Sequence, residues 1–170
     1  MDFVLEAERV LHAEVGIGTM MSRLVTAALL GLVVGLDREY RQHSAGMRTH
    51  MLVSLAAATF ALLTFELIAR MRGDLIQADP VRVIGAVTNG VAFLAAGTII
   101  QGRRGVKGLT TGAGMWMAGA IGLACGIGAY VIAVTGTVLV VIILSLLALV
   151  SPALPKQGAD ARDNEAKTSD

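Results

Sequence analysis

The stretch GLTTGAGMWMAGAIGLACGIGAYVIAVTGTVLVVIILSLLALVSPALP, residues 108–155, contains no Asp, Glu, Lys, Arg or His. As one helix these 48 residues would be about 70 Å long, whereas the hydrocarbon core of a bilayer is about 30 Å thick. The segment must therefore cross a membrane twice. The glycines of Cys125-Gly126-Ile127-Gly128 can form the turn, so the pattern predicts spans over residues 109–124 and 129–150.

Three further apolar runs precede this stretch and predict spans over residues 18–36, 49–69 and 83–101. Asp79-Pro80 predicts the start of the helix over 83–101, because Asp is a good N-cap and Pro suits the first helical turn. Arg23 lies in the early turns of the first span, and we expect its guanidinium to reach the membrane surface. The predicted fold is all-α, a polytopic transmembrane helix bundle of about five spans.

The composition supports a membrane protein. Hydrophobic residues make up 55% of the chain and charged residues 16%, against roughly 25% charged in an average soluble domain. A net charge of +1 gives no electrostatic basis for binding nucleic acid. The one cysteine, Cys125, excludes an internal disulfide and a cysteine-based zinc site.

The distribution of positive charge predicts the orientation. Residues 37–50, 102–107 and the segment after 155 carry nine Lys and Arg, against four on the other side. Because cytoplasmic loops are enriched in Lys and Arg, we expect the amino terminus outside and the carboxyl terminus inside. Residues 1–17 form an acidic amino-terminal segment, expected not to be cleaved. Residues 151–170 are expected to be a disordered cytoplasmic tail.

Small residues recur every fourth position in two spans. Gly114, Ala118, Gly122 and Gly126 share one helix face, and Gly31 and Gly35 share another. Such faces let helix backbones approach closely. We favour packing within the chain over an oligomer interface. A faint repeat at an offset of 62 residues, such as Arg41 with Arg103, resembles the parallel repeats of some transporters.

A charged motif is predicted at the inner membrane face, between the first two spans. Its candidate site residues are Asp37, Arg38, Glu39, Arg48, Thr49 and His50. Pairing of the carboxylates with nearby arginines is the favoured interpretation. The alternative is that Asp37 or Glu39 is a magnesium ligand that retains several waters.

A second set of candidates lies within or beside the later spans. Asn89 is expected to face the bundle interior, because an amide in hydrocarbon needs a partner. Trp116 is expected to be buried against another helix, and Glu66 to be interfacial rather than buried. The remaining polar and packing candidates are Gly90, Gly97 and Thr98.

The loop motif Lys107-Gly108-Leu109-Thr110-Thr111-Gly112 enters the fourth span. The threonines can cap the helix start, and a basic, glycine-containing turn can also bind phosphate there. The sequence shows no Ser-His-Asp or paired-carboxylate arrangement for catalysis, and no cofactor is expected.

Four ordered motifs resemble the MgtC/SapB family of bacterial inner-membrane proteins. They are Gly35-Leu36-Asp37-Arg38-Glu39, Ala45-Gly46-Met47-Arg48-Thr49-His50, Phe93-Leu94-Ala95-Ala96-Gly97-Thr98 and Val106-Lys107-Gly108-Leu109-Thr110-Thr111 with Trp116. The resemblance implies a multi-pass inner-membrane protein. Family members are associated with growth at low magnesium and survival in phagocytes, and one restrains the ATP synthase. The chain looks like a short, SapB-type member without the cytoplasmic domain that follows the last span in long members.

Three classes of function follow. The first, which we favour, is a non-enzymatic regulator of partner membrane proteins during magnesium limitation, with ATP synthase or transporters as partners by resemblance alone. The alternative is a small transporter or channel for magnesium or another ion. A membrane enzyme ranks last, since no nucleophile and base are paired. The expected surroundings of the chain are the lipid bilayer, and association with further copies of the same chain, as a homo-oligomer, is an open alternative.

Overall fold

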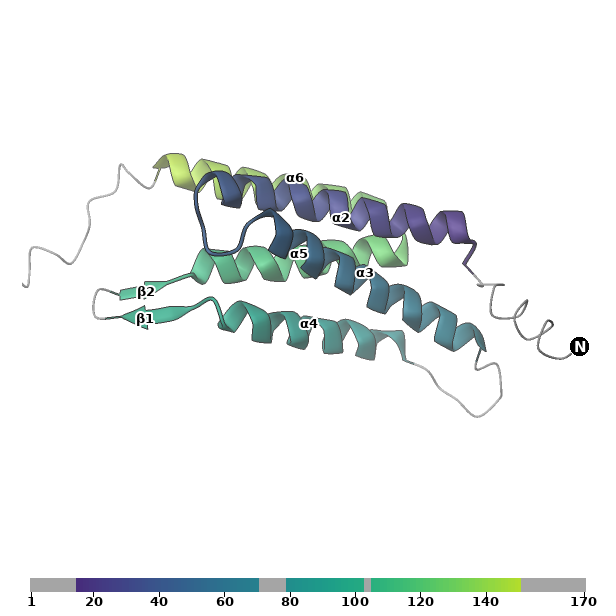
Figure 1. Ribbon diagram of the computed structural model, residues 1–170. Coiled ribbons are helices and arrows are strands. Elements are labelled where there is room, and N and C mark those ends of the chain that lie inside the picture. The colour runs from purple at the N-terminus through teal and green to yellow at the C-terminus, as the bar shows by residue number, and fades with distance from the viewer. Residues whose placement is uncertain (1–14, 71–78, 103–104, 151–170) are drawn as a thin grey trace, which may run out of the picture.

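A computed structural model describes residues 15–70, 79–102 and 105–150. Five helices and one hairpin occur in these ranges (Figure 1). The elements are α2 (Ile17–Tyr40), α3 (Met47–Arg70), α4 (Pro80–Ala96), β1 (Ile100–Gly102), β2 (Gly105–Lys107), α5 (Leu109–Ile127) and α6 (Tyr130–Val150). The prediction of an all-α helical membrane bundle is confirmed.

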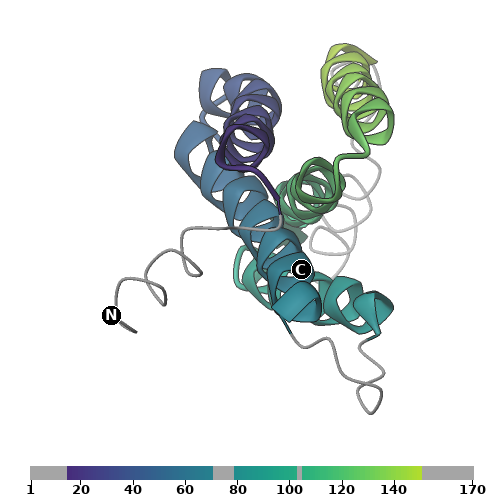
Figure 2. The ribbon, with the colours of Figure 1, turned by 90° about the vertical axis from the view of Figure 1, so that its right-hand side faces the viewer.

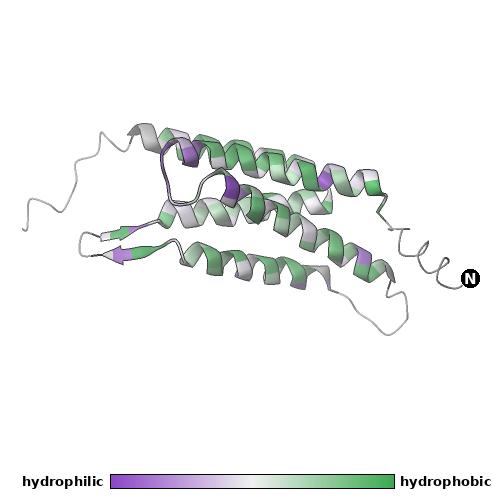
Figure 3. Ribbon diagram, viewed as in Figure 1, coloured by the Kyte–Doolittle hydropathy of each residue, from purple (hydrophilic) through white to green (hydrophobic). Residues whose placement is uncertain are grey.

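The helices run up and down, and α5 lies at the centre of the bundle. α5 contacts α2, α3, α4 and α6, whereas α4 and α6 stand apart on different sides of it (Figure 2). Hydropathy follows this arrangement, since apolar residues cover the helices and polar ones gather toward their ends (Figure 3). By length and composition, α2, α3 and α5 are the described helices able to cross a membrane, and α4 and α6 contain shorter apolar stretches.

Small residues bring the backbones of α2, α3 and α5 together. A Cβ built at Gly31 of α2 would lie 2.7 Å from the His50 carbonyl oxygen, and one at Gly35 would lie 2.6 Å from the Met47 Cα. On α5, a Cβ built at Gly126 would lie 2.6 Å from the Ala58 carbonyl oxygen of α3. Both small-residue faces therefore pack against α3 of the same chain, as expected for packing within the chain.

The hairpin between α4 and α5 was not predicted. The span expected over 83–101 ends as a helix at Ala96, and Ile100 pairs with Lys107 in an antiparallel register. Gly97 is the C-cap of α4, and Gly108, with φ of 89°, redirects the chain into α5. At the other end of α5 the turn lies where the glycines predicted it, with Gly128 at φ 90°.

The basic segments of the described chain meet at one end of the bundle. The loop after α2, the hairpin and the end of α6 lie together, on the left of Figure 1. The start of α2, the end of α3 and the turn between α5 and α6 lie at the opposite end. The acidic segment over 1–14 and the tail over 151–170 lie outside the described residues.

Candidate functional site

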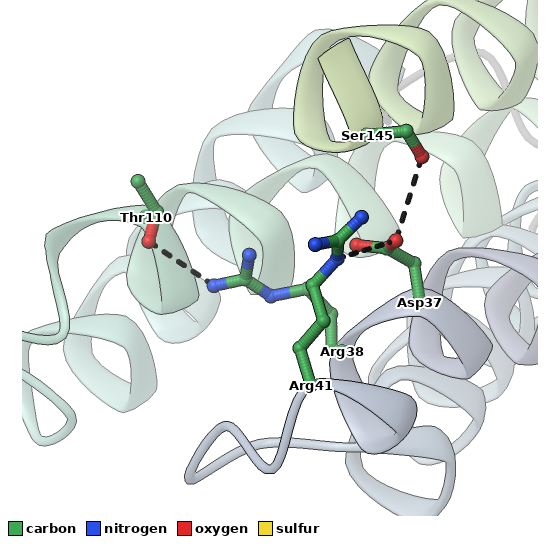
Figure 4. Close-up of polar contacts among 5 residues, drawn as sticks. All are labelled: Asp37, Arg38, Arg41, Thr110 and Ser145. Atoms are coloured by element: carbon green, nitrogen blue, oxygen red, sulfur yellow. Dashed lines mark hydrogen bonds and ion pairs between the residues drawn. The ribbon is translucent and has the colours of Figure 1, made fainter. Parts of the chain in front are cut away.

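Arg38 joins α2 to the start of α5. Its side chain is almost fully buried, with 3% of the residue exposed. The Nη2 atom donates to Thr110 Oγ1 at 3.1 Å (Figure 4). The same atom donates to Thr111 Oγ1 at 3.2 Å. The two hydroxyls thus accept from a guanidinium, and the cap of α5 is Gly108, which supplies no side-chain hydrogen bond. The prediction that the threonines cap this helix is wrong, because their hydroxyls turn toward α2.

Asp37 links α2 to α6 through a different set of contacts. Its Oδ1 accepts from Arg41 Nε at 2.9 Å, an i to i+4 ion pair, and from Ser145 Oγ at 3.4 Å (Figure 4). Pairing of this carboxylate with a nearby arginine is therefore present. Ser145 was missed by the sequence reasoning, although a lone serine in the apolar run of α6 was the available signal.

Glu39 and His50 hold the start of α3. Glu39 Oε2 accepts from the Met47 backbone N–H at 3.0 Å, which satisfies one of the free donors at the start of α3. His50 is fully buried, and its Nδ1 lies 2.8 Å from the Gly46 carbonyl oxygen. The Asp37 and Glu39 carboxylates therefore bind different partners and do not converge. Within the described ranges, no three His, Cys, Asp or Glu residues form a group that could hold a metal ion.

The other residues of this end are more open to solvent. Arg48 is exposed and Thr49 is half-buried in the first turn of α3, and Lys107 is exposed on β2. In the loop, partial burial lowers the pKa of His43, and the nearby Arg38 cation lowers that pKa further. The end of the bundle thus combines buried contacts with an accessible basic rim.

Arg23 lies toward the opposite end. Its Nη1 donates to the Gly126 carbonyl oxygen at 2.8 Å, in the last turn of α5. A cation is favourable there because the carboxyl end of a helix carries partial negative charge. The guanidinium therefore holds α2 to α5 at this end.

Three predicted side-chain positions are wrong. Asn89 is exposed, because α4 packs on α5 through the face that carries Val87 and Val91, and Asn89 lies two residues from each. Trp116 is 47% exposed, because its neighbour Met115 points into the core instead. Glu66 is buried rather than interfacial, with 8% exposed, and its Oε1 accepts from the Val15 backbone N–H at 3.1 Å.

The remaining packing candidates divide into buried and open positions. Ala118 is fully buried, and Gly114 faces His50, since a Cβ there would lie 3.1 Å from Nε2. Thr98 donates to the Ala95 carbonyl oxygen at 2.7 Å. Gly90 is exposed with nothing within 4 Å of an added Cβ, so its predicted role in helix packing is wrong in the described chain.

Two apolar hollows flank α4. A groove of about 700 Å³ separates α3 from α4, and Val53 and Leu94 lie among its lining residues. A smaller hollow of about 360 Å³ lies between α4, α5 and α6, with Trp116 in its wall. Sequence reasoning missed both, because their size depends on the spacing of helices that are far apart in the chain.

These features define an α-helical membrane protein whose polar side-chain contacts are concentrated toward the ends of the bundle. Residues 24–152 match the sequence model of the MgtC family, and the chain belongs to this family. Three relatives are similar at 34–36% identity over 69–73% of this chain. They are the "Putative magnesium transporter YhiD" of Escherichia coli (strain K12), with 58% of its length covered, "Protein MgtC" of Brucella abortus (strain 2308), with 49%, and "Protein MgtC" of Salmonella typhimurium (strain 14028s / SGSC 2262), with 47%.

The chain thus spans about half the length of these curated relatives. No solved structure matches it.

Proposed function

We propose that this chain is a multi-pass protein of the bacterial inner membrane that acts in adaptation to magnesium limitation, as a non-enzymatic regulator of partner membrane proteins. The link to magnesium rests on the resemblance of its motifs and on the name of the E. coli relative. Family membership and the apolar helices support the membrane location. By resemblance, the partners are the ATP synthase or transporters.

The apolar interior of the described bundle is the observation that favours a regulator over a transporter. Two clusters of buried hydrophobic residues fill the space between α2, α3, α4, α5 and α6. Ser54 and Thr137 lie buried there, and each hydroxyl donates to a backbone carbonyl, of Ala27 and Ala133 respectively. A divalent cation requires several oxygen ligands along its route, and these apolar clusters supply none from their side chains.

The alternative is a transporter or channel for magnesium or another ion. The printed name of the E. coli relative favours it. A route between two copies of the chain, or one formed with a partner, would not need a polar interior in a single bundle. The two proposals therefore differ in whether the purified chain alone moves magnesium.

Magnesium flux into proteoliposomes is the test that separates them. The full chain is reconstituted beside an Asp37→Asn variant, and entry of magnesium is followed with a trapped fluorescent indicator. The regulator proposal expects no flux above empty liposomes from protein shown to be folded and inserted. Saturable flux that the variant loses would replace it with the transporter.

A growth assay tests whether the charged end matters. Asp37→Asn removes the negative charge of the side chain to which Arg41 and Ser145 each donate, and Arg48→Ala removes an exposed cation. We expect each variant to reduce growth in magnesium-poor medium to the level of the empty vector at unchanged membrane abundance. Asn89→Ala changes an exposed polar residue of α4 and is the control, with normal growth expected. Normal growth of both charge variants would contradict the proposal.

A further inference from the structure

The buried guanidinium of Arg38 has no carboxylate partner in the described part of the chain. The neighbouring Asp37 forms its ion pair with Arg41, and Glu39 binds the Met47 backbone N–H. The Thr110 and Thr111 hydroxyls accept from Nη2, but Nε is buried and has no hydrogen-bond partner there. The Asp37 carboxylate attracts the Arg38 cation through space but forms no ion pair with it, so the buried guanidinium keeps an unsatisfied N–H donor. Because an unpaired buried donor on a charged group is costly, this position favours an anion that accepts from it.

The start of α5 also favours an anion, because it presents backbone N–H donors that lack partners within the helix. The first backbone bond of this helix runs from the Gly112 N–H to the Gly108 carbonyl oxygen, so the N–H groups of residues 109–111 have no partner within the helix. Gly108 supplies no side-chain cap. The amino end of a helix carries partial positive charge, and Arg38 places a full positive charge beside it. Together they make a site that attracts negative charge.

His50 is a second buried side chain near the start of α5 with an unpartnered polar atom. The residue is fully buried, and its Nε2 has no hydrogen-bond partner in the described chain. This atom faces Gly114, which lies on the same side of α5 as Thr110 and Thr111, one turn further along the helix. A hydrogen phosphate carries acceptor oxygens and an O–H donor, so it can satisfy both the guanidinium and an imidazole nitrogen.

Access to this end of α5 is open. Leu109 is 58% exposed and Thr110 is exposed, while Thr111 and Arg38 lie beneath them. The exposed Arg48 and Lys107 add positive charge to the same end of the bundle. An anion can therefore arrive from the membrane surface without crossing the apolar core.

We propose that the start of α5 is a binding site for a phosphate-type oxyanion, held by Arg38, by the hydroxyls of Thr110 and Thr111 and by the free N–H groups of the helix. Several donors converge there, which suits an anion with several oxygens. The same chemistry is offered by inorganic phosphate and by the headgroup of an anionic phospholipid. The site does not depend on the regulator proposal above, since neither flux nor growth is needed to detect it.

The test uses the full chain in nanodiscs and has two arms. In phosphatidylcholine nanodiscs, inorganic phosphate is titrated against the protein by calorimetry at constant ionic strength, with chloride as the reference anion. In mixed nanodiscs, native mass spectrometry counts the phosphatidylglycerol that the protein retains over phosphatidylcholine. Binding in the first arm identifies a free anion, and retention in the second identifies a lipid headgroup.

Matched variants decide whether binding occurs at this site. Arg38→Gln and Arg48→Gln remove the same charge from the same end of the bundle, but only Arg38 contacts α5 at Thr110 and Thr111. We expect Arg38→Gln to weaken binding by about tenfold or more, since it removes a charged hydrogen-bond donor. Arg48→Gln should weaken it by less than about twofold, as for a screened surface charge.

Thr110→Val keeps the proposal testable if Arg38→Gln fails to fold, because Thr110 is exposed and the change conserves its shape. Loss of its hydroxyl should weaken binding by about threefold to tenfold. Binding of neither probe to the unaltered chain would overturn the proposal. Equal weakening by Arg38→Gln and Arg48→Gln would overturn it as well, since it would indicate diffuse attraction to a basic surface.

Discussion

At Gly122 the absence of a side chain sets how closely α3 and α5 approach. A Cβ at this position would overlap the Ser54 carbonyl oxygen of α3. Ser54 also donates from Oγ to the Ala27 carbonyl oxygen of α2 at 2.7 Å. A shift of α3 away from α5 would therefore disturb a second helix contact, and one added methyl group affects three helices.

Gly122→Ala is expected to destabilise the bundle by about 1–3 kcal/mol, the usual cost of overpacking a rigid core. Gly90→Ala is the matched control, because an added Cβ in α4 has nothing within 4 Å. It should leave stability unchanged or raise it by up to about 1 kcal/mol through helix propensity. Unfolding of both variants in detergent, followed by circular dichroism, measures the difference. Equal midpoints would show that the α3–α5 contact is not tight.

Single residues show where sequence reasoning was sufficient and where it was not. The spacing of Gly31 and Gly35 and of Gly122 and Gly126 predicted close packing, because small residues on one face are a local property of a helix. The positions of Asn89 and Trp116 were wrong, since a helix that is apolar all round does not indicate which face meets its neighbours. The pairing of Arg38 with Thr110 and Thr111 depends on α2 and α5 lying side by side, which no local pattern gives.

Among the elements, the β1–β2 hairpin determines how α5 begins. Gly108 follows β2 at φ 89°, a left-handed conformation that residues with a Cβ rarely adopt. A Cβ there would also overlap the Thr98 carbonyl oxygen. The hairpin thus delivers the chain to the start of α5 through a position where only glycine fits.

Gly108→Ala is expected to be more damaging than Gly105→Ala. Both residues have positive φ, at 89° and 116°, so each alanine carries backbone strain of about 1–2 kcal/mol. An added Cβ at Gly105 meets nothing within 4 Å, whereas at Gly108 it meets backbone. Thermal unfolding and the yield of folded protein in detergent compare the two. A Gly108→Ala variant as stable as Gly105→Ala would indicate that the turn into α5 can rearrange.

The hairpin also explains an error in the predicted elements. Ile99 and Ile100 extend the apolar run over 83–101, and this continuity predicted a helix that reaches residue 101. The strands are three residues each, which is too short for a strand pattern to be recognised. The helices themselves could be predicted, because long apolar runs bounded by charges and glycines determine them locally.

At the scale of the whole molecule, the up-and-down order places the loop over 41–46 and the hairpin at the same end of the bundle (Figure 1). The sequence placed these two segments on one side because two predicted spans, over 49–69 and 83–101, separate them, and their Lys and Arg content then assigned that side as the inner one. In the structure, the directions of α3 and α4 also bring the loop and the hairpin to the same end of the bundle. The structure therefore agrees with the predicted grouping, while the side of the membrane is a prediction from charge.

Cysteine labelling in intact cells tests both the grouping and the side. Cys125 is buried, so Cys125→Ala provides the background. Three exposed positions then receive a single cysteine each: Thr19 at the start of α2, Ser44 in the loop after α2 and Gln101 in β1. With the amino terminus outside, a membrane-impermeant maleimide should label Thr19→Cys on intact cells. It should label Ser44→Cys and Gln101→Cys only after permeabilisation.

The three positions separate two kinds of failure. The reverse pattern would invert the orientation and leave the fold intact, because Ser44→Cys and Gln101→Cys would still behave alike. Opposite labelling of these two positions would contradict the fold itself, since an odd number of crossings would then separate the loop from the hairpin. In the structure two helices, α3 and α4, connect them, so an even number of crossings must bring the chain back to the same side. The orientation thus depends on a modest excess of charge, whereas the shared side of the two segments depends on the packing of the whole bundle.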